Sequence, residues 1–142
     1  MYTLELAWFD IDVPDSARID ADVSSPSPLF SNMRAGTHWR IDLGRFVLIA
    51  ALDPVRGLQD LSRDGYDRAE PAEHMTVNDV PGLRIGGYDS DRSQTDWAFT
   101  INGLMLVLTL RSQSGDRLQP SDTERREHAA IVSSVRRVSR DG

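Results

Sequence analysis

The sequence has no cysteine, no lysine and no long apolar run. A chain without cysteine forms no disulfide, no thiolate metal site and no iron–sulfur cluster, and it has no cysteine nucleophile. Without lysine it offers no Schiff base and no lysine to the phosphates of a Walker A loop. Because no apolar stretch approaches the roughly 20 residues that cross a bilayer, we expect no membrane span.

The charge balance is acidic, since 16 arginines and 22 acidic side chains over 142 residues give a net charge of −6. Phosphate repels an acidic chain, so nucleic acid is not an expected partner. The length predicts a single domain over 1–142 that buries roughly 70% of the surface exposed in the unfolded chain. The N-terminus lacks the basic start and apolar stretch of a signal peptide, which predicts a cytoplasmic location.

The first 36 residues are predicted to contain one strand and one long loop. Apolar and acidic residues alternate over 9–13, which is typical of a half-buried strand, and Pro14 ends it. Residues 14–36 are rich in serine and proline and predict a long surface loop. Phe30 and Met33 lie toward its far end, where they are candidates to pin the loop to the core and to contact a partner.

Two continuously apolar runs, 46–52 and 104–110, predict strands that are covered on both faces and lie at the centre of a sheet. The second run follows Asn102-Gly103, a strong signal for a tight hairpin. We therefore expect 95–101 to pair with 104–110. A groove lined by the side chains of 104–110 and by the loop 14–36 would be the natural binding site.

Two helices are predicted. An aspartate followed by proline predicts a capped helix over 54–65. Ser121 and Glu124 have the spacing of a capping box, and apolar residues recur at helical spacing after them. These features predict a second helix over 122–138.

Short strands are predicted at 75–77 and 83–85, around a turn at 80–82. Because hairpin connections dominate, the predicted fold class is α+β. We expect a largely antiparallel sheet of about six to seven strands, with helices packed on its faces as in an α/β/α sandwich.

Four segments match a known pattern: Val13-Pro14, Leu58-Gln59-Asp60-Leu61, Trp97-Ala98-Phe99 followed by Gly103, and the ending Ile131-Val132-Ser133-Ser134-Val135-Arg136. With these segments the sequence resembles the PsbP-like and DcrB-like superfamily of α/β/α sandwiches. The resemblance implies a mainly non-enzymatic scaffold, because its relatives include assembly factors, lipoproteins and the Eag-type chaperones of type VI secretion. It implies no catalytic residue set and no cofactor.

Charge is distributed unevenly between the two ends of the chain. The first 22 residues hold six acids and one arginine, which predicts a negative patch that includes Asp10 and Asp12. The last 26 residues hold six arginines and four acids, so Arg136 and Arg137 are candidates for a basic face that binds an anionic partner. A solvated helix end explains the arginines equally well. The two opposite charges could also support a homodimer.

The three histidines, His38, His74 and His128, do not have zinc-binding spacing, and no metal site is predicted. His128 falls on the apolar stripe of the last predicted helix, so we expect a core histidine. Glu73-His74 is a candidate acid–base pair, although a solvated loop is the simpler interpretation.

The sequence therefore favours a non-enzymatic protein-binding module, a cytoplasmic adaptor or chaperone of the secretion-related kind, whose partner is another protein. Two alternatives stay open. One is an acidic immunity protein that neutralises a basic toxin. The other is a small-molecule-binding protein or an enzyme that uses Glu73 and His74.

Overall fold

The computed structural model describes residues 1–6, 9–21, 38–53, 73–86, 94–101, 104–114 and 118–138. Within these ranges the chain forms ten strands and one helix. The elements are β1 (Tyr2–Leu6), β2 (Phe9–Val13), β3 (Arg18–Ala21), β4 (His38–Asp42), β5 (Phe46–Asp53), β6 (Glu73–Val77), β7 (Val80–Gly86), β8 (Gln94–Ile101), β9 (Leu104–Ser112), α2 (Asp122–Ser133) and β10 (Arg136–Arg137).

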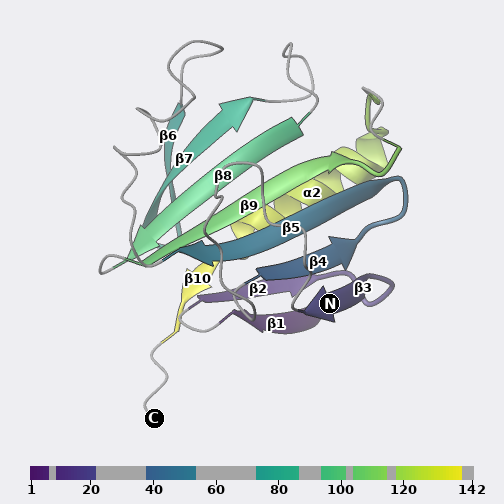
Figure 1. Ribbon diagram of the computed structural model, residues 1–142. Coiled ribbons are helices and arrows are strands. Elements are labelled where there is room, and N and C mark those ends of the chain that lie inside the picture. Colours follow the sequence, from purple (N-terminus) through teal and green to yellow (C-terminus); the bar gives the residue numbers. More distant parts are fainter. Residues whose placement is uncertain are drawn as a thin grey trace.

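The strands form two separate sheets (Figure 1). The larger sheet has seven strands in the order β3-β4-β5-β9-β8-β7-β6, and the smaller has three in the order β1-β2-β10. All of the strand pairs are antiparallel. Because β10 follows α2, the small sheet joins the two ends of the described chain.

The predicted α/β/α sandwich with helices on its faces is wrong. The described chain is mostly β-structure, and its one helix, α2, lies against one face of the seven-stranded sheet (Figure 1). The prediction failed because it did not separate the first strands into a second sheet and because it treated the chain after α2 as helix. The helix predicted over 54–65 lies outside the described residues.

The predicted capping box at the start of α2 is confirmed. Ser121 Oγ accepts from the backbone N–H of Glu124 at 3.1 Å, and Glu124 Oε1 accepts from the backbone N–H of Ser121 at 2.9 Å. The helix ends at Ser133 rather than at 138, with Ser134 as its C-cap. The Ser134 hydroxyl donates to the Ile131 carbonyl and accepts from the backbone N–H of Asp12, so the chain leaves α2 toward β2.

The hydrophobic core lies between the seven-stranded sheet, α2 and the three-stranded sheet. The predicted central position of the two apolar runs is confirmed, because β5 and β9 are neighbours in the middle of the larger sheet. Leu48 of β5 and Leu110 of β9 face this core, while Val47 and Val107 are buried on the opposite face. Burial on both faces explains why these strands are continuously apolar.

The two predicted hairpins have different outcomes. The pairing of 95–101 with 104–110 is confirmed, since Ile101 lies opposite Leu104. The turn predicted at 80–82 is wrong, because Asn78 and Asp79 turn the chain with φ of 48° and 65°. Gly82 instead lies within β7 under the ring of Phe99. A Cβ at this position would approach the ring to 2.7 Å, so packing requires the glycine.

The range predicted as the loop 14–36 contains β3, which pairs with β4 at the end of the larger sheet. Phe30 and Met33 lie outside the described residues. Within the described ranges, no helix has both the length and the apolar character that crossing a bilayer requires.

Candidate functional site

The small sheet brings together candidate residues from both ends of the chain. In its register Arg136 of β10 lies opposite Asp10 of β2. The Arg136 guanidinium bonds both carboxylate oxygens of Asp12, from Nη1 to Oδ2 at 3.1 Å and from Nη2 to Oδ1 at 3.1 Å. The predicted acidic and basic regions are therefore in direct contact within one chain.

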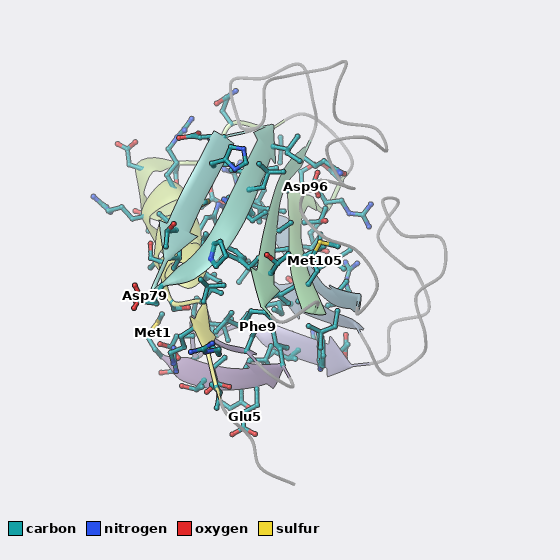
Figure 2. All side chains as sticks on the ribbon, turned by 90° about the vertical axis from the view of Figure 1, so that its left-hand side faces the viewer. Met1, Glu5, Phe9, Asp79, Asp96 and Met105 are labelled. Atoms are coloured by element: carbon teal, nitrogen blue, oxygen red, sulfur yellow. The ribbon has the colours of Figure 1, made fainter. Side chains whose placement is uncertain are left out.

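Alternation along β2 positions these carboxylates. Phe9, Ile11 and Val13 are fully buried, so Asp10 and Asp12 project from the other side of the strand. Figure 2 shows Phe9 on the side of the small sheet that faces the larger sheet. The acidic residues that make β2 alternate are thus held at the surface by the burial of their neighbours.

Asp12 has two side-chain donors and is held as a carboxylate. Thr3 Oγ1 donates to Asp12 Oδ1 at 2.7 Å, beside the bonds from Arg136. The hydrogen bonds from Arg136, and then from Thr3, hold the pKa of Asp12 below its usual value, while partial burial opposes this effect. The Asp12 carboxylate in turn raises the pKa of Arg136.

Hydrogen bonds hold the C-terminal end of α2 and the residues after it beside this ion pair. Arg136 Nη1 also donates to the Ser134 carbonyl at 3.0 Å. From the β6–β7 turn, Asn78 Nδ2 donates to the carbonyls of Ser133 at 3.0 Å and Val135 at 2.9 Å. The bond to Ser133 satisfies a carbonyl that the helix end leaves without a partner inside the helix, and the other two hold the chain that follows α2.

Strand parity and register place Thr3, Glu5, Asp10, Asp12 and Arg136 on the side of the small sheet that faces away from the core, and we call these residues the outer face. Glu5 lies directly opposite Asp10, so two like charges share one cross-strand position. Figure 2 shows Glu5 pointing away from the body of the molecule. With three carboxylates and one guanidinium, the outer face is acidic.

The small sheet ends at β1, which has no strand on its other side among the described residues. Asp12 donates its backbone N–H away from β1, to Ser134 Oγ at 2.7 Å. In an antiparallel pair, two opposite residues direct their backbone groups either toward each other or away from each other. Thr3 lies opposite Asp12, so the N–H and C=O of Thr3, and those of Glu5 two residues later, point to the open edge.

The same edge strand carries exposed apolar side chains. Among the described residues, the large hydrophobic residues that are exposed are Met1, at 68%, and Tyr2, at 53%. Tyr2 shares its side of β1 with the buried Leu4 and Leu6. At this edge, backbone groups therefore point outward, and the exposed Tyr2 extends the row of apolar side chains that Leu4 and Leu6 form on the core side of β1.

Glu73 and His74 do not form a pair on one surface. They are consecutive residues of the edge strand β6, so their side chains point to opposite faces of the sheet. Glu73 Oε2 instead lies 3.2 Å from Arg84 Nη1 on the neighbouring strand. No cluster of three or more potential metal-ligating side chains occurs within the part of the chain that the structure describes.

His128 is a core histidine, as the sequence predicted. It is 4% exposed, and its ring packs edge-on against Phe46 with 5.1 Å between centroids. Burial lowers the pKa of His128, and the charge of Glu124 opposes this shift. The apolar side chains that surround the His128 ring leave no space for a water molecule, so this part of the core is not a ligand pocket.

Asp12 and Arg136 were predicted as candidate residues, whereas Thr3, Ser134 and Asn78, which bond in the same region, were not. The alternation of apolar and polar residues over 2–6 was a usable signal for β1 and for the outward position of Thr3. The other two residues bond backbone groups far away in the sequence, Ser134 the N–H of Asp12 and Asn78 two carbonyls after α2 begins, and no local pattern reports such contacts.

No protein-family model matches the sequence, and no curated protein matches it. Among solved structures, the chain is similar to cyanobacterial PsbP (CyanoP) from Synechocystis sp. PCC 6803, whose structure was solved in solution. The TM-score is 0.60 at 16% sequence identity, and the match covers 96% of this chain and 91% of that chain. The resemblance to PsbP-like proteins is thus confirmed at the level of fold, while the link to DcrB-like proteins and secretion chaperones stays a prediction. The chain has a PsbP-like fold.

Proposed function

We propose that this chain is a protein-binding module, an adaptor or chaperone that holds its partner at the β1 end of the small sheet. The observation that carries the proposal is the start of β1, where Tyr2 and the preceding Met1 are exposed at an end of the small sheet as described. Unpaired strand edges and exposed apolar side chains are both surfaces on which proteins associate. Here the two features coincide on one strand.

A toxin-neutralising immunity protein is the second candidate, and the acidic outer face favours it. Carboxylates that face solvent attract a basic partner and steer its approach, and added salt weakens that attraction. An apolar contact at β1 responds much less to salt. The two candidates therefore differ in the ionic strength at which the partner dissociates.

The test is affinity capture from a native lysate at low and moderate salt, with identification of the captured proteins by mass spectrometry. We expect one stoichiometric protein with the wild type, and a reduced yield of it with Tyr2→Ser. His74→Ser, on β6 at an edge of the larger sheet, is the matched control and should capture the same amount as the wild type. Loss of the partner at moderate salt would favour the immunity protein, and no captured protein at either salt would contradict both candidates.

A further inference from the structure

We propose that two copies of the chain associate through β6, which pairs with its own copy so that the two larger sheets join edge to edge. β6 is the last strand of the larger sheet within the described ranges (Figure 1). The backbone of an end strand is a template on which another chain can pair. This surface is separate from the β1 end, so the inference goes beyond the proposed function and does not depend on it.

The turn between β6 and β7 determines which backbone groups of β6 point outward. Asn78 and Asp79 form a two-residue connection, and φ is positive at both. In such a turn the flanking residues, here Val77 and Val80, bond each other. Bonded and non-bonded pairs alternate from there, so the next residue of β6, Thr76, directs its N–H and C=O away from β7.

Pro81 supports this assignment independently. It lies opposite Thr76 and has no N–H, so these two residues cannot form a fully bonded pair. His74, two residues before Thr76, has the same outward orientation. Both side chains are exposed, so solvent reaches this part of β6. The outward backbone groups of His74 and Thr76 are therefore accessible to a second strand.

One antiparallel register between two β6 strands uses all of these outward groups. In it, His74 of each copy lies opposite Thr76 of the other, and each pair exchanges both of its backbone hydrogen bonds. Met75 then lies on the twofold axis, opposite the partner's Met75. The same surface is used on both copies, so the assembly closes at a dimer.

The side chains of β6 are compatible with this register. Met75 and Val77 pack against the core but are only partly buried, so a second strand would cover them further. Glu73 would lie opposite the partner's Val77, where it meets no like charge. Its carboxylate already lies 3.2 Å from Arg84 Nη1 of its own chain. The strand is therefore complementary to itself in shape and in charge.

This dimer differs from the one that the charge distribution suggested. The acidic and basic ends of the chain meet within one copy, since Arg136 bonds both carboxylate oxygens of Asp12. Those charges are therefore used inside the fold, and the association is assigned to β6. Because β6 has only five residues, the contact is small, and an interface below roughly 1,200 Å² is typical of weak, transient association.

Sedimentation velocity of the full chain from about 5 to 500 µM tests this weak dimer. We expect the average mass to rise from the 15.9 kDa of one chain toward twice that value. Thr76→Pro removes an outward N–H from each copy and no bond to β7, so it should weaken the dimer at least about tenfold. Thr76→Val keeps the N–H and should dimerise like the wild type.

A pair of cysteine variants tests the register without a proline. The chain has no cysteine, so Met75→Cys introduces one thiol per copy. The two thiols would face each other in a non-bonded pair, where Cα atoms about 4.5 Å apart suit a disulfide. Val77→Cys is the matched control on the same side of β6. With oxidised glutathione, we expect Met75→Cys to cross-link at least about tenfold faster than Val77→Cys.

The mass of a single chain at every concentration would overturn the inference. A dimer that a folded Thr76→Pro variant forms as well as the wild type would overturn it too, as would equal cross-linking of the two cysteine variants. Circular dichroism shows whether Thr76→Pro folds, and the cysteine pair decides if it does not. None of these measurements needs a captured partner, so failure to capture one would contradict the proposed function and leave the dimer in place.

Discussion

The guanidinium of Arg136 holds the carboxylate of Asp12 through two hydrogen bonds, although 124 positions separate the two residues in the sequence. This pair fastens β10 to β2 and so closes the small sheet on which the proposed partner surface depends. Bidentate arginine–carboxylate pairs have strict geometry, which makes them more useful for fixing position than most surface ion pairs. Both side chains are about one-third exposed, so their contribution to stability is moderate.

We expect Asp12→Asn and Arg136→Leu each to lower the free energy of unfolding by about 1 kcal/mol. The double variant should lose less than the sum of the two, because both single changes break the same contact. Urea unfolding at low and high salt measures this coupling. Arg137→Leu, at the exposed next position of β10, is the control and should change stability by less than about 0.5 kcal/mol. Additive losses from Asp12 and Arg136 would contradict the role given to the pair.

The start of α2 predicts a specific loss of stability in acid. Arg45 Nε donates to Glu124 Oε2 at 3.2 Å, and its Nη2 bonds Oε1, so Arg45 and then Ser121 hold the pKa of Glu124 at about 2. A carboxylate whose pKa is lower in the folded chain stabilises it above the unfolded pKa of about 4.5. That contribution is lost as the pH falls from about 4.5 toward 2. Glu124→Gln should remove this part of the pH dependence of urea unfolding.

Ser121→Ala is the companion variant for this measurement. It removes the hydroxyl that caps the helix but leaves the ion pair with Arg45, so it should lower stability by about 1 kcal/mol at neutral pH. Most of the acid dependence should persist in it. An acid response that is unchanged in Glu124→Gln would show that other carboxylates are responsible.

The buried position of His128 predicts a second pH range, higher than that of Glu124, in which the stability of the fold depends on pH. Its pKa is lowered by burial, so the unfolded chain takes up a proton at that site more readily than the folded chain. Stability is therefore fully present above about pH 6.5 and declines as the pH falls below that value. The charge of Glu124 opposes this shift, and the ring packs edge-on against Phe46.

His128→Leu should flatten the decline in thermal stability between about pH 6.5 and 5, although a change in packing lowers or raises the whole curve. His74→Gln, at an exposed position of β6, should leave the decline in place. A decline that persists in His128→Leu would show that the buried histidine does not control stability in this range.

Features that depend on neighbouring residues were predictable from the sequence, and features that depend on distant ones were not. Ser121 and Glu124 are three positions apart, so their spacing alone identified the cap. Likewise the apolar runs identified β5 and β9, because burial on both faces leaves a continuous local pattern. The pairing of Asp12 with Arg136 leaves no such pattern, so each was assigned to a separate charged surface.

The helix predicted over 122–138 is longer than the observed one, because distant contacts that the local pattern does not report end it earlier. Val135 and Val138 continue the helical spacing, yet the backbone ends α2 at Ser133 because Ser134 bonds β2 and Arg136 bonds Asp12. β10 is two residues long, so it shows no alternation of apolar and polar residues from which a strand could be predicted. Tertiary contacts therefore outweigh the local periodicity at this end of the chain.

The turn residue Asn78 combines a conformational role with a bonding role, and two substitutions separate them. Its φ of 48° favours asparagine or glycine, and its side-chain amide bonds the Ser133 and Val135 carbonyls at the end of α2. Asn78→Gly keeps the backbone conformation and loses the amide, so we expect a loss of about 1 kcal/mol. Asn78→Ala loses both and should cost about 1 kcal/mol more, measured by thermal unfolding. If the glycine variant were as stable as the wild type, the amide would have no part in fixing α2, and the end of the helix would depend on Ser134 and Arg136 alone.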